Sequence, residues 1–115
     1  MTRRYEDYLF DIVENARKII VFVNNLTYKE FEEDEKTLYA VVRGFEIIGE
    51  ATRNIPDEIK IRFPEIEWHK MATMRNRLIH EYFGTDLEIV WETTQKDVPI
   101  LIKQIQKVLN DLNLE

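Results

Sequence analysis

The stretch RRYEDYLFDIVENARKIIVFVN, residues 3–24, has the apolar pattern of a long amphipathic helix. Its apolar positions recur at spacings of three and four without a gap, and they are Tyr5, Tyr8, Leu9, Ile12, Val13, Ala16, Ile19, Ile20 and Val23. An α-helix has 3.6 residues per turn, so these positions lie on one face. The pattern predicts a helix from about Arg3 to Asn24, ended by the pair Asn24-Asn25.

The same period returns in the next long segment, from about Glu35 to Asn54. Its expected buried stripe is Leu38, Val41, Val42, Phe45, Ile48 and Thr52. Gly44 and Gly49 lie inside this helix, where a glycine costs about 1 kcal/mol relative to alanine. The two glycines indicate a close approach of another backbone, or they are simply tolerated.

Capping signals and prolines divide the rest of the chain. Thr27 with Glu30 forms a capping-box pattern that predicts a short helical turn over the acidic stretch. The segment PDEIKIRF, residues 56–63, predicts a short turn closed by Pro64. No segment alternates apolar and polar residues in the way that strands do.

Two more helices follow. The first should run from about Trp68 to Phe83, with Gly84 as its C-terminal cap. Thr85 with Glu88 has the capping-box form and predicts the start of the next helix. Pro99 should kink or split that helix, because proline lacks an amide donor. A further apolar stripe runs from Val98 to Leu112, so the fold class is all-α.

Composition limits the functional classes. A chain of 115 residues suits a single domain, 1–115, and 44% apolar residues suffice for a core. No stretch approaches the roughly 20 apolar residues that cross a bilayer, and the charged start does not have the pattern of a signal peptide, so we expect no membrane. The chain has no cysteine, as expected for a cytoplasmic protein.

Charge is unevenly distributed. The net charge is −6, which would repel nucleic acid if it were spread evenly. The stretch WHKMATMRNRLIH, residues 68–80, nevertheless carries Lys70, Arg75 and Arg77 and no acid, whereas EFEEDE, residues 30–35, is strongly acidic. A local positive patch on an acidic body is therefore possible.

The segment RNRLIHEY, residues 75–82, concentrates groups that can act on a phosphodiester. Arg75 and His80 are five positions apart, so they diverge by about 140° on a helix. Arg75 shares a stripe with Met71 and Leu78, where a charge needs a partner or a wet cleft. Two copies meeting across a twofold axis would bring both pairs of groups to one cleft.

The residues of the chain allow only a few kinds of catalytic chemistry. The chain has no serine nucleophile, no glycine-rich phosphate loop and no convincing metal-ligand spacing, so we expect no cofactor and no metal. Histidine and arginine suffice for metal-free cleavage of RNA, since histidine transfers protons near neutrality and arginine clamps the phosphate. The structural alternative makes Arg75 and Arg77 surface ion-pair partners, His80 a helix-terminal cation and Tyr82 an edge of the core.

Three segments resemble one family along nearly the whole chain. They are GFEIIGEATRNIP (44–56), FPEIEWHKMATMRN (63–76) and MRNRLIHEYFGTDLEIVW (74–91), and they resemble the HepT-like toxins of the HEPN-domain proteins. The family motif is arginine, four residues, histidine, any residue and tyrosine. Here it falls on Arg75, His80 and Tyr82, with Asn76 as the polar residue after the arginine.

The resemblance implies a HEPN-type up-down bundle of four to five main helices that forms a twofold homodimer. It implies an endoribonuclease toxin whose antitoxin, a minimal nucleotidyltransferase, transfers AMP to Tyr82. We expect His80 to act as general acid or base, Arg75 to clamp the transition state, and Asn76 to orient the imidazole or the phosphate.

Two cations near the motif are weaker candidates for RNA contact. Arg77 and Lys70 could bind the RNA backbone, although solvated ion pairing is the favoured interpretation of Lys70. Two other functional classes stay open: a non-catalytic helical partner subunit of a minimal nucleotidyltransferase, and a purely structural dimerisation module.

Overall fold

A computed structural model describes residues 2–74, 76–78 and 86–114. Every regular element in these described ranges is helical, which confirms the expected all-α class. The elements in chain order are α1 (Tyr5–Val23), α2 (Tyr28–Glu33), α3 (Glu35–Arg53), α4 (Asp57–Arg62), α5 (Trp68–Ala72), α7 (Leu87–Glu92), the π-helix η1 (Thr93–Asp97) and α8 (Val98–Asp111).

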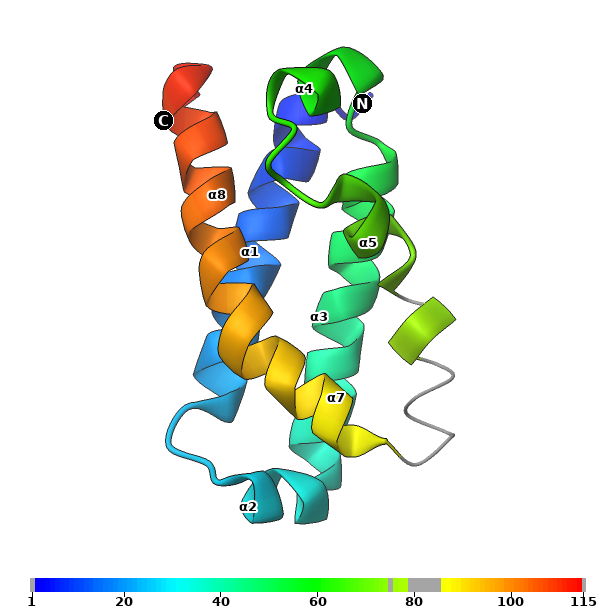
Figure 1. Cartoon of the computed structure of the whole chain (residues 1–115), viewed down its shortest axis with the longest axis vertical. Helices are drawn as coiled ribbons and strands as arrows, with labels where there is room; N and C mark the ends of the chain where they lie inside the picture. The colour runs from blue at the N-terminus through cyan, green and yellow to red at the C-terminus, as the bar shows by residue number, and fades with distance from the viewer. Residues whose placement is uncertain (1, 75, 79–85, 115) are drawn as a thin grey trace.

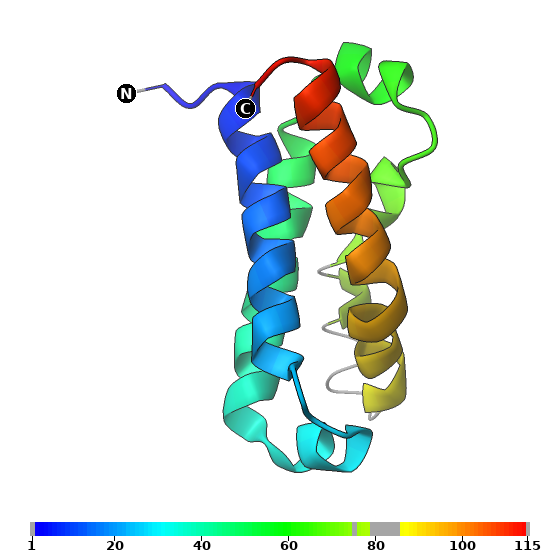
Figure 2. The same ribbon diagram turned by 90° about the vertical axis from the view of Figure 1, so that its left-hand side faces the viewer.

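Three long rods form the body of the bundle (Figure 1). Helices α1 and α3 and the continuous α7–η1–α8 segment follow the long axis of a molecule that measures 41 × 31 × 26 Å. The short α2 closes one end, and α4 and both termini lie at the other end (Figure 2). Within the described ranges, no helix is long and apolar enough to cross a membrane.

The core lies between α1 and its two neighbours, α3 and α8. Leu9, Ile12, Ala16 and Ile19 of α1 are fully buried, as the periodicity predicts. At Gly44 of α3 the two helices come so close that an added Cβ would lie 2.8 Å from Ile19 Cγ1. Gly44 therefore marks the close approach that the sequence suggested.

Local capping begins and ends the first helices. α1 begins at Tyr5 instead of Arg3 and ends at Val23. Asn25, two residues later, has a positive φ of 65°, which does not continue a right-handed helix. The capping box that precedes α2 is confirmed, because Glu30 N–H donates to Thr27 Oγ1 over 3.1 Å and Thr27 N–H donates to Glu30 Oε1 over 2.9 Å.

The helix expected from Trp68 to Phe83 is not continuous. α5 begins at Trp68 as predicted but ends at Ala72, and helical backbone returns at Met74 and at residues 76–78. The Thr73 hydroxyl lies 3.1 Å from the His69 carbonyl oxygen and 3.2 Å from that of Lys70. Such bonds share carbonyls with the backbone hydrogen bonds, and they slightly destabilise and often bend a helix. The predicted end at Phe83 and the Gly84 cap lie outside the described residues.

The last long segment stays helical through Pro99, so it is not split, but its α-helical pattern changes just before that residue. The structure adds a π-helical turn, η1, that the proline alone did not predict. Thr93 and Thr94 each donate a side-chain hydrogen bond to a carbonyl in α7, over 2.8 and 2.6 Å. These bonds weaken the regular backbone hydrogen bonding of the helix. They do so next to Pro99, which has no backbone N–H to donate. α7 itself begins at Leu87 after Asp86, and the predicted cap residue Thr85 lies outside the described residues.

Candidate functional site

The three motif residues Arg75, His80 and Tyr82 lie outside the described residues. The structure describes both sides of the segment that carries them: Met74 and residues 76–78 at its start, and Asp86 at its end. The site is therefore built from its surroundings. The roles assigned to the three motif side chains stay predictions.

The start of the segment has the two faces that the helical wheel predicts. Met71, Met74 and Leu78 are buried, with exposed fractions of 5, 6 and 2%. Asn76 and Arg77 are exposed. The backbone N–H groups of Asn76 and Arg77 both donate to the Thr73 carbonyl, over 3.1 and 3.2 Å. Met71 and Met74 line a common cavity with Phe45 and Ile48 of α3, whereas Asn76 and Arg77 are exposed.

Lys70 is held by carboxylates from two elements. Its Nζ lies 3.5 Å from Glu67 Oε2 and 3.6 Å from Asp97 Oδ2. The favoured interpretation of Lys70 as an ion-pairing residue is confirmed. Sequence spacing suggests the Glu67 partner, three residues away, but contains no signal for Asp97, which folding brings from η1.

The far side of the segment is acidic. Asp86 precedes α7, and the Tyr28 hydroxyl on α2 donates to Glu32 Oε2 over 3.4 Å. Partial burial of Tyr28, together with the negative charges of Glu32, Glu88 and Asp86, raises the pKa of its hydroxyl. The described charges on this side of the segment are therefore negative.

Aromatic packing joins α2 to α7 on this acidic side. The Trp91 ring lies 5.1 Å from the Phe31 ring and 6.3 Å from the Tyr28 ring, measured between centroids. Phe31 is fully buried. This cluster fixes α7 against α2. It therefore also positions Asp86, which directly precedes α7 and is the first described residue after the motif segment.

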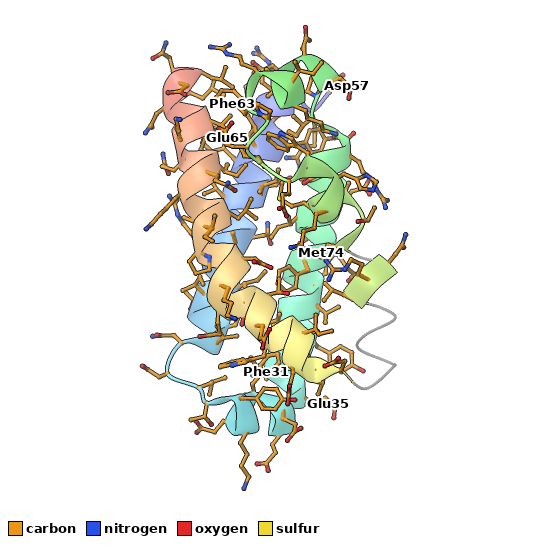
Figure 3. The ribbon with its side chains drawn as sticks, in the orientation of Figure 1. Phe31, Glu35, Asp57, Phe63, Glu65 and Met74 are labelled. Carbon is orange, nitrogen blue, oxygen red and sulfur yellow. The ribbon has the colours of Figure 1, made fainter. Side chains whose placement is uncertain are left out.

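A cavity of about 180 Å³ lies beside the start of the segment, between α3, α5, η1 and α8. Its lining comprises Phe45, Ile48, Glu65, Ile66, Glu67, Lys70, Met71, Met74, Thr93, Asp97, Val98, Ile100, Leu101 and Gln104. Glu65 and Met74 are labelled in Figure 3. In the described part of the chain, no group of three or more His, Asp or Glu side chains is placed to hold a metal ion. The cavity is a tertiary feature that sequence reasoning missed.

Comparison with known proteins agrees with the resemblance. Residues 12–108 match the family described as ribonuclease HepT-like. The chain is 44% identical over 108 residues to the "Probable ribonuclease HepT" of Thermococcus cleftensis, covering 94% of this chain and 98% of that protein. It is 43% identical over 108 residues to a candidate RNase of Methanocaldococcus jannaschii, covering 94% and 89%.

A third relative is a candidate RNase of Caldanaerobacter subterraneus, 39% identical over 102 residues, with 89% of this chain and 91% of that protein covered. No solved structure gives a significant match. The match over residues 12–108 includes the whole segment from Arg75 to Tyr82 and both of its described flanks. The chain therefore belongs to the HepT-like ribonuclease family.

Proposed function

We propose that this protein is a metal-independent endoribonuclease that acts as the toxin of a toxin–antitoxin pair. The family match carries the proposal, because it covers residues 12–108 and so includes the complete RxxxxHxY motif. Arg75, His80 and Tyr82 are the residues of this chain that fill the motif.

The proposed reaction uses the 2′-hydroxyl of the substrate as nucleophile. An imidazole removes the 2′-hydroxyl proton as the oxygen attacks phosphorus, and a proton passes to the departing 5′-oxygen. The new bond joins the 2′-oxygen to phosphorus, and the bond from phosphorus to the 5′-oxygen breaks. The products are a 2′,3′-cyclic phosphate and a 5′-hydroxyl, and DNA is not a substrate because it lacks the nucleophile.

Two copies would supply the required groups. In a twofold dimer one His80 can accept the first proton and the His80 of the other copy can donate the second. The paired Arg75 guanidinium groups would bind the phosphate oxygens and stabilise the charge that grows on them. Asn76, which is exposed near the start of the segment, is proposed to orient the phosphate or the imidazole.

The electrostatics of the described flanks support an approach of RNA from one side. Arg77 is exposed at the start of the segment, whereas Asp86 and Glu88 stand at its end. Arg77 is proposed to contact the RNA backbone. Lys70 is a weaker candidate for the same contact, and its ammonium pairs with Glu67 and Asp97.

The same site is proposed to be silenced by modification. A minimal nucleotidyltransferase antitoxin would transfer AMP from ATP to Tyr82, with the phenolic oxygen attacking the α-phosphorus and pyrophosphate leaving. The attached phosphate brings negative charge two residues from His80. It would occupy the arginines and exclude the RNA phosphodiester.

Cleavage is tested with purified protein on an RNA and on a DNA of the same sequence, with a chelator present. His80→Ala and Arg75→Ala should each lower the rate at least about 100-fold. His69→Ala is the matched control, because His69 is the other histidine of the chain and is exposed on α5. Equal cleavage by all four proteins, or equal cleavage of DNA, contradicts the proposal.

Modification is tested by incubating the protein with its cognate transferase and ATP and measuring intact mass. Wild type should gain whole AMP units and lose RNase activity, and Tyr82→Phe should gain none. Tyr39→Phe is the matched control, since Tyr39 is 59% exposed on α3. A wild-type protein that is inert on RNA, but is required for the transferase to modify other targets, would identify a partner subunit instead of a toxin.

A further inference from the structure

The cavity beside the start of the motif segment is built to hold one apolar group. Its walls include Phe45, Ile48, Met71, Met74 and Leu101, all of which are buried. A volume of about 180 Å³ is well below the roughly 300–1,000 Å³ of pockets for drug-sized ligands. It is close to that of an engineered 150 Å³ cavity that binds benzene. One aromatic ring or one branched aliphatic side chain therefore fits.

The mouth of the cavity carries a net negative charge. Three carboxylates line it, from Glu65, Glu67 and Asp97, against the single ammonium of Lys70, which gives a net charge of −2. Lys70 neutralises part of this charge by lying between Glu67 and Asp97. A group that enters the cavity therefore gains most if a cation accompanies it at the mouth.

The apolar surface continues beyond the mouth. Ile100 lines the cavity from α8 and is 56% exposed, so apolar area extends onto the outer surface. A buried pocket surrounded by apolar and then charged surface is the arrangement that receives an anchoring side chain at protein interfaces. This extension favours a macromolecular partner over a small free molecule.

We infer that this cavity is a docking site for a segment of another protein. The segment presents one large aliphatic or aromatic side chain, which enters the cavity, and lysine or arginine residues beside it, which meet Glu65, Glu67 and Asp97. Ile100 packs against the segment outside the mouth. The inference is independent of the proposed RNase activity, because none of these contacts uses Arg75, His80 or Tyr82.

The methionines provide a direct readout. The chain has three of them, and two, Met71 and Met74, line the cavity. With ¹³C-methyl methionine in the full-length protein, NMR reports occupancy of the cavity through the signals of these two residues. The probe is a capped alanine-rich helical peptide with one leucine, and lysines three residues before it and four after it, which share one face with the leucine.

This peptide should shift the Met71 and Met74 signals. A matched peptide with alanine in place of the leucine should bind about tenfold more weakly, because the buried aliphatic group is lost. A matched peptide with glutamates in place of the lysines should also bind about tenfold more weakly at low salt. Equal shifts from all three peptides, or no shift from any of them, overturn the inference.

Surface variants and a small probe separate the alternatives. Ile100→Ala and Glu65→Gln should each weaken binding of the peptide, whereas Val21→Ala, at an exposed position on α1, should not. If 4-methylpentylammonium shifts both signals as strongly as the peptide at equal concentration, the occupant is a small amine and the docking proposal is wrong. If both signals shift with protein concentration alone and Ile100→Ala abolishes that shift, the occupant is a second copy, and the proposal is again wrong.

Discussion

Substitution of Gly44 by alanine tests how closely α1 and α3 pack. In a free helix this change would stabilise the helix by about 1 kcal/mol. In this protein the new methyl carbon would lie 2.8 Å from Ile19 Cγ1 and 3.0 Å from Cδ1, against an ordinary carbon contact of roughly 3.5–4.0 Å. Ile19 is fully buried and its β-branched side chain is stiff, so it cannot easily turn away.

Overpacking of this kind costs about 1–3 kcal/mol, which exceeds the gain in helix propensity. We therefore expect Gly44→Ala to lower the free energy of unfolding by about 1 kcal/mol, and to lower Tm by roughly 4 °C in a chain of this size. The assay is urea and thermal unfolding followed by circular dichroism, at one fixed protein concentration.

A double-mutant cycle isolates the contact. Ile19→Ala alone should cost about 2–5 kcal/mol, because it opens a cavity. In the Gly44→Ala background the Ile19→Ala substitution should cost about 1 kcal/mol less. The new methyl group fills part of the cavity that Ile19→Ala opens, and it no longer overlaps with the Ile19 side chain. The reasoning is refuted if Gly44→Ala raises stability by about 1 kcal/mol and the two substitutions are additive.

Two further predictions concern pH and subunit composition. Hydrogen bonds from the Thr37 hydroxyl and backbone N–H lower the pKa of Asp34. The stability that this carboxylate contributes should be complete above about pH 4 and lost as pH falls through its lowered pKa. Asp34→Asn keeps a capping acceptor without a titrating group. The free energy of unfolding of the wild type, minus that of this variant, should therefore decrease as the pH drops below about 4. The opposite trend would contradict the assignment. Adding an excess of His80→Ala subunits to the wild-type protein should lower its RNase activity at least about tenfold, because a mixed dimer keeps only one of the two histidines that transfer protons at the shared cleft. Mixed dimers, verified by mass, that keep half of the wild-type activity would exclude a shared site.

Local sequence determined the helices and their ends. The apolar periodicity of residues 3–24 and 35–54 gave α1 and α3 to within two residues at each end. The capping box at Thr27 gave the start of α2. Such features depend on contacts within one or two turns, so they can be predicted from the residues themselves. The candidate site is local in the same sense, because its motif spans only residues 75–82.

Local sequence failed where a second interaction competed with periodicity. The helix expected from Trp68 to Phe83 is interrupted, because the hydroxyl of Thr73 bonds to carbonyls of the preceding turn. The same chemistry, at Thr93 and Thr94, contributes to a π-helix before Pro99. The pattern of apolar residues does not reveal where such side-chain hydrogen bonds disturb the backbone hydrogen bonds of a helix.

The sequence by itself determined that this chain is a helical bundle with a histidine–arginine motif, since helical periodicity and motif spacing are properties of neighbouring residues. Only the tertiary structure decided which distant groups meet. It brought Asp97 to Lys70, 27 positions along the chain, set Gly44 against Ile19, and left an acid-rimmed cavity between α5 and α8. These features depend on how far helices approach and which faces they turn together, and that is settled by packing of the whole core.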